Sequence, residues 1–182
     1  GWRWDQYLPG DRSELIWEEY LAPEELPSMT NPKSGFLHSA NQSPFHVSSE
    51  GNNPKASDYP VESGWPTRMT NRAVRGLELL GANEKISAAN FNDIKHDNAY
   101  SPRYRGYRYL ASVAQLDPNT AEEARAITLI KDWDLRTDKA NRHAALGVCI
   151  FLEEWQSERA DKVPPAPRLA LNKCMDSVRD VA

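Results

Sequence analysis

Apolar residues recur at helical spacing throughout the part of the chain that follows Thr67. The first such run consists of Met69, Ala73, Leu77 and Leu80. Gly81 comes directly after it, at a position where a glycine commonly ends a helix. Two further runs follow a serine, one after Ser87 and one that opens at Ser101 and continues toward Leu116. The spacing therefore predicts three successive helices.

Three more helices are predicted closer to the C-terminus. Thr120 and Glu123 stand three residues apart, as in a capping box, and open a fourth helix. A fifth helix, over about 141–158, is apolar on nearly every side in its middle, so it should be the buried one. A last short helix follows the stiff proline-rich linker at 164–167. We expect residues 67–182 to form a helical segment of five to six helices.

Residues 1–66 show the signals of strands and loops, and we treat them as a separate segment. Aromatic residues partly alternate with polar ones at 2–7. Apolar residues at 15–17 suggest a second strand, although the flanking glutamates also suit a short helix. Residues 48–66 are rich in Ser, Asn, Pro and Gly, which predicts a long ordered loop. A loop of that length within a compact domain usually has a function.

Residues 30–44 place rigid loop signals on both sides of a short apolar run. Pro32 sets an extended or turn conformation at its start, Gly35 permits a tight reversal, and Pro44 prevents a strand from continuing. A short strand between these points would deliver the side chain of Asn41 to its far end. A rigidly held amide is a fixed hydrogen-bond donor, which is what a developing oxyanion needs.

Composition and charge narrow the range of partners. The chain has 182 residues, the size of one domain, and its 13 prolines against nine glycines indicate much irregular backbone. A formal net charge of -4 gives no field that would attract nucleic acid or an anionic membrane. The longest apolar run, at 144–152, is well short of the about 20 residues that a membrane span needs. We expect neither a nucleic-acid partner nor a membrane span.

Arginines and tyrosines interleave between residues 100 and 109, a composition that can stack on bases and contact phosphates. On an acidic chain we interpret it as a helix surface whose tyrosines pack and whose arginines pair with acidic residues. Cys149 lies in an apolar run and is interpreted as a small buried side chain, because two cysteines define neither a disulfide framework nor a zinc site. The four histidines show no metal-ligand spacing, and no G-x-S-x-G or phosphate-loop motif occurs.

Six short motifs carry a resemblance to a known family. They are GDRSE at 10–14, YLAPEELP at 20–27, NPKSGF at 31–36, ANQSP at 40–44, TR at 67–68 and DWD at 132–134. Together they resemble the middle of the β-subunit of the penicillin acylase family, which includes the acyl-homoserine-lactone acylases and belongs to the N-terminal-nucleophile hydrolases. The motifs stand in the expected order, and the last fifty or so residues carry little that is specific.

The resemblance implies an α+β fold, in which residues 1–66 supply strands to one edge of an αββα sandwich and a helical lobe follows. It also implies an enzyme that hydrolyses the linear amide of an N-acylated amine, such as an acylated homoserine lactone or β-lactam nucleus. The nucleophile is the N-terminal Ser of the β-subunit, whose own α-amine acts as the base. The chain begins at Gly1, so we expect that Ser to lie on sequence outside it and this piece to be inactive alone.

Two residues of the chain receive roles from the resemblance. Asn41 would donate its side-chain amide to the oxyanion. Arg68, 27 residues further on, would orient Asn41 and the amine of the nucleophile and help the substrate to bind. The other α- and β-subunit segments of the acylase are the expected partners, and the expected location is the bacterial periplasm or the exterior.

No cofactor is expected. Some members of the family bind calcium between subunits, but this chain has Asn52 and Asn53 near the position of one ligand carboxylate. A rival interpretation from another class remains open: a helical binding or scaffold module in which Asn41 and Arg68 only close turns.

Overall fold

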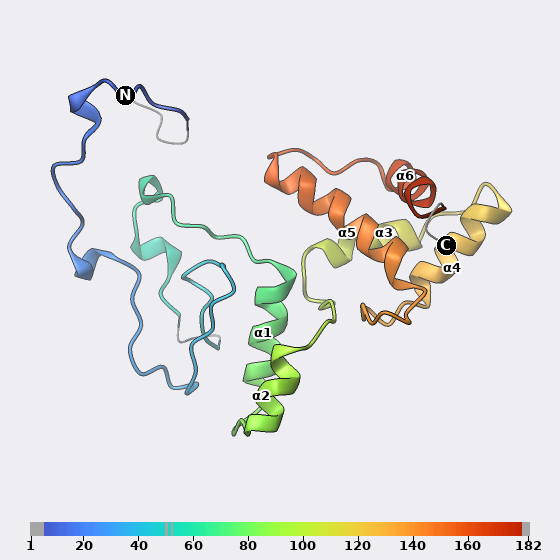
Figure 1. Ribbon diagram of the computed structural model, residues 1–182, viewed down its shortest axis with the longest axis horizontal. Coiled ribbons are helices and arrows are strands. Elements are labelled where there is room, and N and C mark those ends of the chain that lie inside the picture. The colour runs from blue at the N-terminus through green and yellow to red at the C-terminus, as the bar shows by residue number, and fades with distance from the viewer. Residues whose placement is uncertain (1–5, 50, 52, 180–182) are drawn as a thin grey trace.

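The computed structural model describes residues 6–49, 51 and 53–179. Its α-helices are α1 (Asn71–Gly81), α2 (Ala88–Lys95), α3 (Gly106–Ala114), α4 (Ala121–Lys131), α5 (Ala144–Arg159) and α6 (Pro167–Arg179). Short 3-10 turns precede them at Ser13–Leu15, Pro23–Glu25, Ala56–Asp58 and Val61–Ser63. The N-terminal segment lies on one side of α1, and α3 to α6 gather on the other (Figure 1). The predicted helical lobe is therefore confirmed.

Two helix starts follow the capping signals in the sequence. The hydroxyl of Ser87 accepts a hydrogen bond from the Asn90 amide at 3.1 Å, and α2 begins directly after it. The hydroxyl of Thr120 accepts one from the Glu123 amide at 3.0 Å at the start of α4. Each cap satisfies a backbone N–H that has no partner inside its helix.

The core lies among α3, α4, α5 and α6, and α5 packs against each of the other three. Its fully buried side chains include Val113, Ile150 and Leu171, one each from α3, α5 and α6. Burial of an aliphatic side chain of this size contributes about 1.5–3 kcal/mol. The expectation that the fifth helix would be the buried one is confirmed.

The interpretation of the Tyr/Arg stretch is confirmed for the side chains that follow, although residues 100–105 precede α3 and do not lie on a helix surface. The ring of Tyr100 stacks on Phe151 with centroids 4.5 Å apart, and the ring of Tyr104 meets Phe151 edge-on at 5.7 Å. The guanidinium of Arg105 forms ion pairs with Glu154 and Glu158 on α5. The tyrosines thus belong to the core, and this arginine joins α3 to α5.

The interpretation of Cys149 as a buried thiol is wrong. Its sulfur forms a disulfide with Cys174, and the two Cα atoms are 5.7 Å apart. The bond joins α5 to α6, two helices that are connected by the loop at 160–166. Sequence spacing could not reveal this pairing, because it depends on which faces of the two helices meet.

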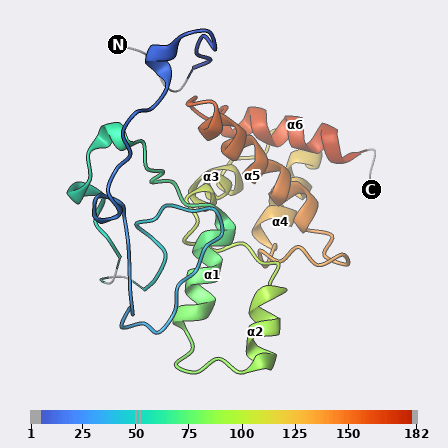
Figure 2. The same ribbon diagram turned by 60° about the vertical axis from the view of Figure 1, so that its left-hand side comes forward.

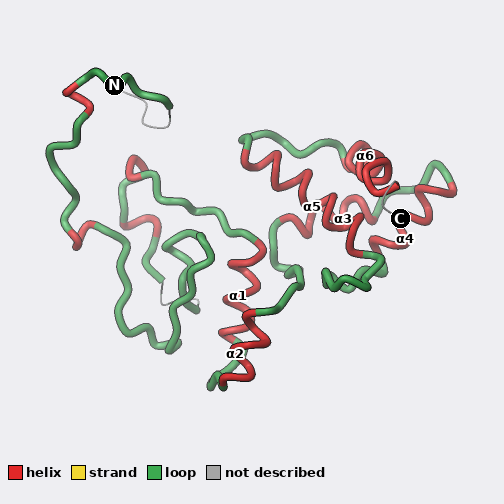
Figure 3. The backbone as a smooth tube through the Cα atoms, viewed as in Figure 1, coloured by secondary structure: helices red, strands yellow, loops and turns green. Residues whose placement is uncertain are grey.

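The strands predicted within residues 1–66 are not seen. Figure 3 shows loop and short helical turns throughout the described part of this segment, and residues 13–15 form a 3-10 turn. Residues 2–5 lie outside the described residues. A strand needs a neighbour to satisfy its main-chain groups. Among the described residues near Asn41, a link of that kind is the bond from the His38 N–H to the Val47 carbonyl, at 2.8 Å.

Viewed from another side, the N-terminal segment starts away from α1 and then runs down to pass beside that helix (Figure 2). Its exposed apolar side chains include Tyr7, Ile16, Trp17, Tyr20, Leu21 and Leu37.

None of the described helices is both long and apolar enough to cross a bilayer.

Candidate oxyanion site

Asn41 stands in a tight loop with a left-handed backbone, φ 58°. Asn adopts this conformation more readily than other side chains that carry a Cβ, because its short amide can bond locally. Gly35 is also left-handed, φ 76°, and closes a turn with a 2.9 Å bond from its N–H to the Pro32 carbonyl. The sequence anticipated the turn at Gly35 but not the conformation of Asn41.

The loop is closed from inside by the side chain of Gln42. Its Nε2 donates to the carbonyls of His38 and His46, at 3.0 and 2.8 Å, and its Oε1 accepts from the Ala40 N–H. Ser43 next to it is fully buried. One carboxamide therefore holds three backbone groups on both sides of Asn41.

Arg72 contacts Asn41 from α1. Its Nη2 donates to the Asn41 Oδ1 at 2.8 Å and to the Ala40 carbonyl at 3.0 Å. A guanidinium has donors only, so this contact identifies the bonded atom of the amide as oxygen and leaves its NH₂ group as the outward donor. Asn41 is exposed, and the structure gives its Nδ2 no partner among the described residues.

Arg68 contacts a different part of the molecule. Its Nη1 donates to the Glu158 carbonyl at 2.9 Å, and its Nη2 forms an ion pair with Asp161 just after α5. Among the described residues, no hydrogen bond joins Arg68 to Asn41. The structure thus brings Asn41 together with Arg72, which the sequence interpretation did not single out.

The loop rests on α1 through a close contact at Gly76. A Cβ at this position would overlap the imidazole of His38, so only a glycine allows the loop to come this near. The buried Nε2 of His38 has no hydrogen-bond partner among the residues that the structure describes. Burial, and secondarily the charge of Arg72, lowers the pKa of His38, which keeps the ring neutral against the helix. Arg72 and Gly76 are one turn apart, so a single face of α1 carries the loop.

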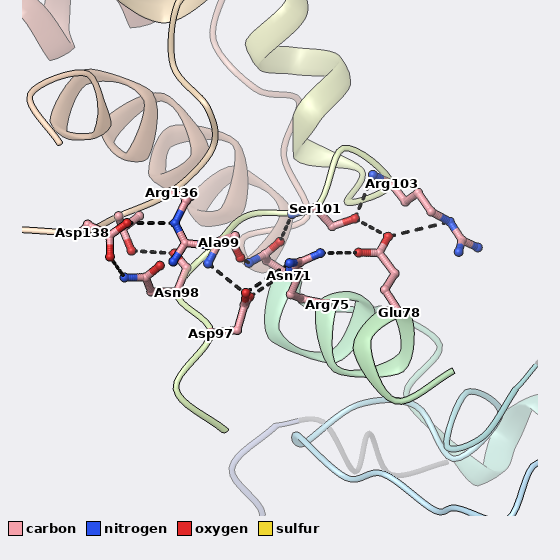
Figure 4. A network of polar contacts seen from close by, with 11 residues as sticks. Asn71, Arg75, Glu78, Asp97, Asn98, Ala99, Ser101, Arg103, Arg136 and Asp138 are labelled. Atoms are coloured by element: carbon pink, nitrogen blue, oxygen red, sulfur yellow. Dashed lines mark hydrogen bonds and ion pairs between the residues drawn. The ribbon is translucent and has the colours of Figure 1, made fainter. Parts of the chain in front are cut away.

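Another face of α1 is fixed to the segment that leads into α3 (Figure 4). The side-chain amide of Asn71 donates to the Ala99 carbonyl at 3.1 Å and accepts from the Ser101 N–H at 2.8 Å. Arg75 makes two bonds to the Asp97 carboxylate, at 2.8 and 3.1 Å. These contacts set the position of α1 relative to the helices that follow.

Glu78 extends the same face by one turn. Its Oε1 accepts a hydrogen bond from the fully buried hydroxyl of Ser101 at 2.6 Å. Burial alone would raise the pKa of Asp97 in the same network, but its hydrogen bonds to Arg75 and the charge of that guanidinium hold the pKa below its ordinary value. The Asp97 carboxylate is therefore charged and paired with Arg75 near neutral pH.

The loop after Asn41 offers a poor ligand for calcium. The Asn53 Oδ1 accepts from the Val47 and Ser48 amides, both at 2.9 Å, so its lone pairs are already used by the backbone. Asn52 lies outside the described residues. Among the residues that the structure describes, no group of three or more His, Cys, Asp or Glu side chains could hold a metal ion.

An outward amide donor, oriented by a guanidinium on a loop with fixed backbone, defines an arrangement suited to stabilising negative charge on a carbonyl oxygen. The chain belongs to the penicillin amidase family, whose model matches residues 2–177. Membership indicates an acylase-type hydrolase in the full-length protein.

Proposed function

We propose that the chain supplies the oxyanion-binding part of an acylase that hydrolyses the linear amide of an N-acylated amine. The observation that carries this proposal is the pair formed by Asn41 and Arg72, because it presents a neutral N–H donor to solvent in a single orientation. Family membership supports the class of reaction. The sequence resemblance to the family suggests the substrate class, a penicillin-type amide or an N-acyl-homoserine lactone.

In this proposal the nucleophile is an N-terminal Ser on sequence outside this chain. Its hydroxyl oxygen attacks the amide carbon, and its own α-amine accepts the proton. The carbonyl oxygen becomes an oxyanion that receives a hydrogen bond from the Asn41 Nδ2. Collapse of the intermediate breaks the C–N bond, the protonated amine passes its proton to the leaving nitrogen, and water then hydrolyses the acyl-enzyme.

We assign the orienting role to Arg72. It already donates to both the side chain of Asn41 and the carbonyl just before it. Arg68 is the second candidate, by resemblance, and it would have to exchange its contacts with Glu158 and Asp161 for a contact with Asn41. A guanidinium suits the role because it stays charged and offers several donors in fixed directions.

The remaining α- and β-subunit segments of the acylase are the proposed partners. The exposed apolar side chains before residue 40 support this, because several large apolar side chains exposed close together often mark a surface that another protein segment covers. Those segments would also give residues 6–66 the strand neighbours that they lack here, and so complete the sheet of an αββα sandwich. The Cys149–Cys174 disulfide supports a periplasmic or secreted location, since such bonds persist in oxidising compartments.

The experiment compares two glycine substitutions in the complete, processed acylase. Asn41→Gly removes the amide and tolerates the left-handed backbone, so we expect kcat to fall by about a hundredfold or more with the melting temperature kept. Asn31→Gly is the matched control, because Asn31 is likewise exposed and left-handed, φ 50°. Near-normal turnover by the Asn41 variant would mean that Asn41 only closes a turn, which is the interpretation of the chain as a scaffold module.

A further inference from the structure

The loop that carries Asn41 has very little secondary structure to hold it. Asn41 is exposed, its backbone is in a sparsely populated conformation, and the described residues around it form no strand. Arg72 orients the side chain and binds one backbone group, the Ala40 carbonyl, but the rest of the backbone of residues 38–46 must be fixed by other contacts. A donor that must meet a developing charge tolerates little displacement, since an error of about 1 Å can cost about a hundredfold in rate.

Gln42 is the residue that satisfies this requirement. Its side chain donates to the carbonyls of His38 and His46, the two ends of the loop, and so spans the loop as a strand neighbour would. Its Oε1 accepts from the N–H of Ala40, whose carbonyl is bound by Arg72. The residue directly before Asn41 is therefore held at its N–H by Gln42 and at its carbonyl by Arg72.

The chemistry of these contacts requires an amide of this length. Two carbonyls need two N–H donors, and the Ala40 N–H needs an acceptor, which only a carboxamide supplies from one group. A carboxylate would present lone pairs to the two carbonyls, and an aliphatic side chain would leave three backbone groups without a partner. The sequence interpretation gave Gln42 no role, because a glutamine in a loop carries no signal of its own.

We propose that Gln42 is a positioning residue for the acylase reaction: it fixes the backbone on both sides of Asn41 so that the Asn41 Nδ2 meets the oxyanion. Gln42 does not touch the substrate and acts only through Asn41. This inference rests on the proposed function. It predicts that loss of Gln42 lowers kcat while substrate binding, which depends on other surfaces, is kept.

Asn53 provides a matched control within the same chain. It is also a carboxamide that binds only backbone, with its Oδ1 on the Val47 and Ser48 amides and its Nδ2 on the Ser48 and Ser49 carbonyls, at 3.0 and 3.1 Å. It stabilises the neighbouring loop, and none of these hydrogen bonds reaches residues 40 or 41. A substitution there tests what general loosening of these loops does to the rate.

The experiment measures kcat, KM and melting temperature for Gln42→Met and Asn53→Leu in the complete, processed acylase. We expect Gln42→Met to lower kcat by about a hundredfold with KM nearly unchanged, whereas Asn53→Leu lowers the melting temperature and keeps kcat. Equal loss of kcat in both variants, or unchanged kcat in Gln42→Met, would overturn the proposal while the proposed function stands. A complete protein that hydrolyses no linear amide would overturn both.

A second measurement needs no variant and no turnover. Amide hydrogen exchange in the unaltered complete, processed acylase reports directly whether the Ala40 N–H is bonded. We expect strong protection of this proton, although it lies in a surface loop, and protection of the same order for the Val47 and Ser48 amides that Asn53 binds. Exchange of the Ala40 proton at the rate of an open loop would contradict the positioning role even if Gln42→Met failed to fold.

Discussion

The four-helix region from α3 to α6 and the N-terminal segment before α1 are stabilised in different ways. In the first, apolar side chains from each helix are buried against one another, and a disulfide and ion pairs join the helices. In the second, large apolar side chains are exposed, and order near Asn41 depends on a few polar contacts to the backbone and to α1. The core is therefore held by contacts among its own helices, whereas the region around Asn41 is held by contacts with its own backbone and with α1.

The largest expected difference between the regions concerns apolar truncation. Ile150→Ala should lower the free energy of unfolding by about 4 kcal/mol, because Ile150 is fully buried in α5 and its removal leaves a cavity. Ile16→Ala is the control, since that side chain is 70% exposed, and it should change stability by less than about 0.5 kcal/mol. Chemical denaturation measures both, and equal effects would remove the distinction between the two regions.

The disulfide should have a slightly smaller effect, confined to the helical region. Cys149 and Cys174 are 25 residues apart, and a loop of that length gives a stabilisation of about 3.5 kcal/mol in the chain-entropy model. Reduction with dithiothreitol should therefore shift the denaturation midpoint of the helical region down by a corresponding amount. An unchanged midpoint after complete reduction, confirmed by thiol titration, would show that the bond does not stabilise this region.

Gly76→Ala should affect the contact between the regions without affecting the core. An added methyl group would overlap His38 and push the Asn41 loop away from α1, at a cost of about 1–3 kcal/mol for overpacking. Gly81→Ala is the matched control on the same helix, because its nearest neighbour, the Ser49 Oγ, is 3.9 Å from the added Cβ. We expect a lower kcat in the complete acylase only for the Gly76 variant, and the same kcat in both would contradict this contact.

The smallest effect is a pH dependence at the other face of α1. The pKa of Asp97 is held low in the folded state, so its pair with Arg75 stabilises the protein fully above the unfolded pKa of about 3.9. This contribution is lost as the pH falls through the lower folded pKa. Asp97→Asn should therefore be less stable than the unaltered chain at neutral pH, with the gap closing in acid. A gap that stays constant with pH would exclude the ion pair as its source.

The helical region could be predicted well from the sequence, for a physical reason. Helices are stabilised by contacts between residues three and four apart, so spacing and caps such as Ser87 and Thr120 are visible along the chain. Strands cannot be predicted from the sequence in the same way, because the residues that pair with a strand can lie far away along the chain or on another segment. The disulfide was missed because it depends on how α5 and α6 face each other.

The candidate site was predicted in part. Asn41 and the turn at Gly35 stand out in the sequence, because Asn, Pro and Gly punctuate loops for known reasons. Arg72 and Gln42 did not stand out. Three arginines occur close together at 68, 72 and 75, and linear distance from Asn41 cannot distinguish them. Helical periodicity could have provided a signal, since Arg72 shares a face with Gly76 and Arg75 lies on the face of Asn71 and Glu78.

We propose that a guanidinium on α1 holds the Asn41 amide in place for catalysis, and a pair of lysine substitutions in the complete, processed acylase distinguishes the two candidate arginines. Arg72→Lys keeps the charge but not the planar set of donors, and we predict a fall in kcat of about tenfold or more. Arg68→Lys, whose side chain contacts Glu158 and Asp161, should retain near-normal kcat. A normal kcat in the Arg72 variant together with a lowered kcat in the Arg68 variant would show that Arg68, and not Arg72, orients Asn41.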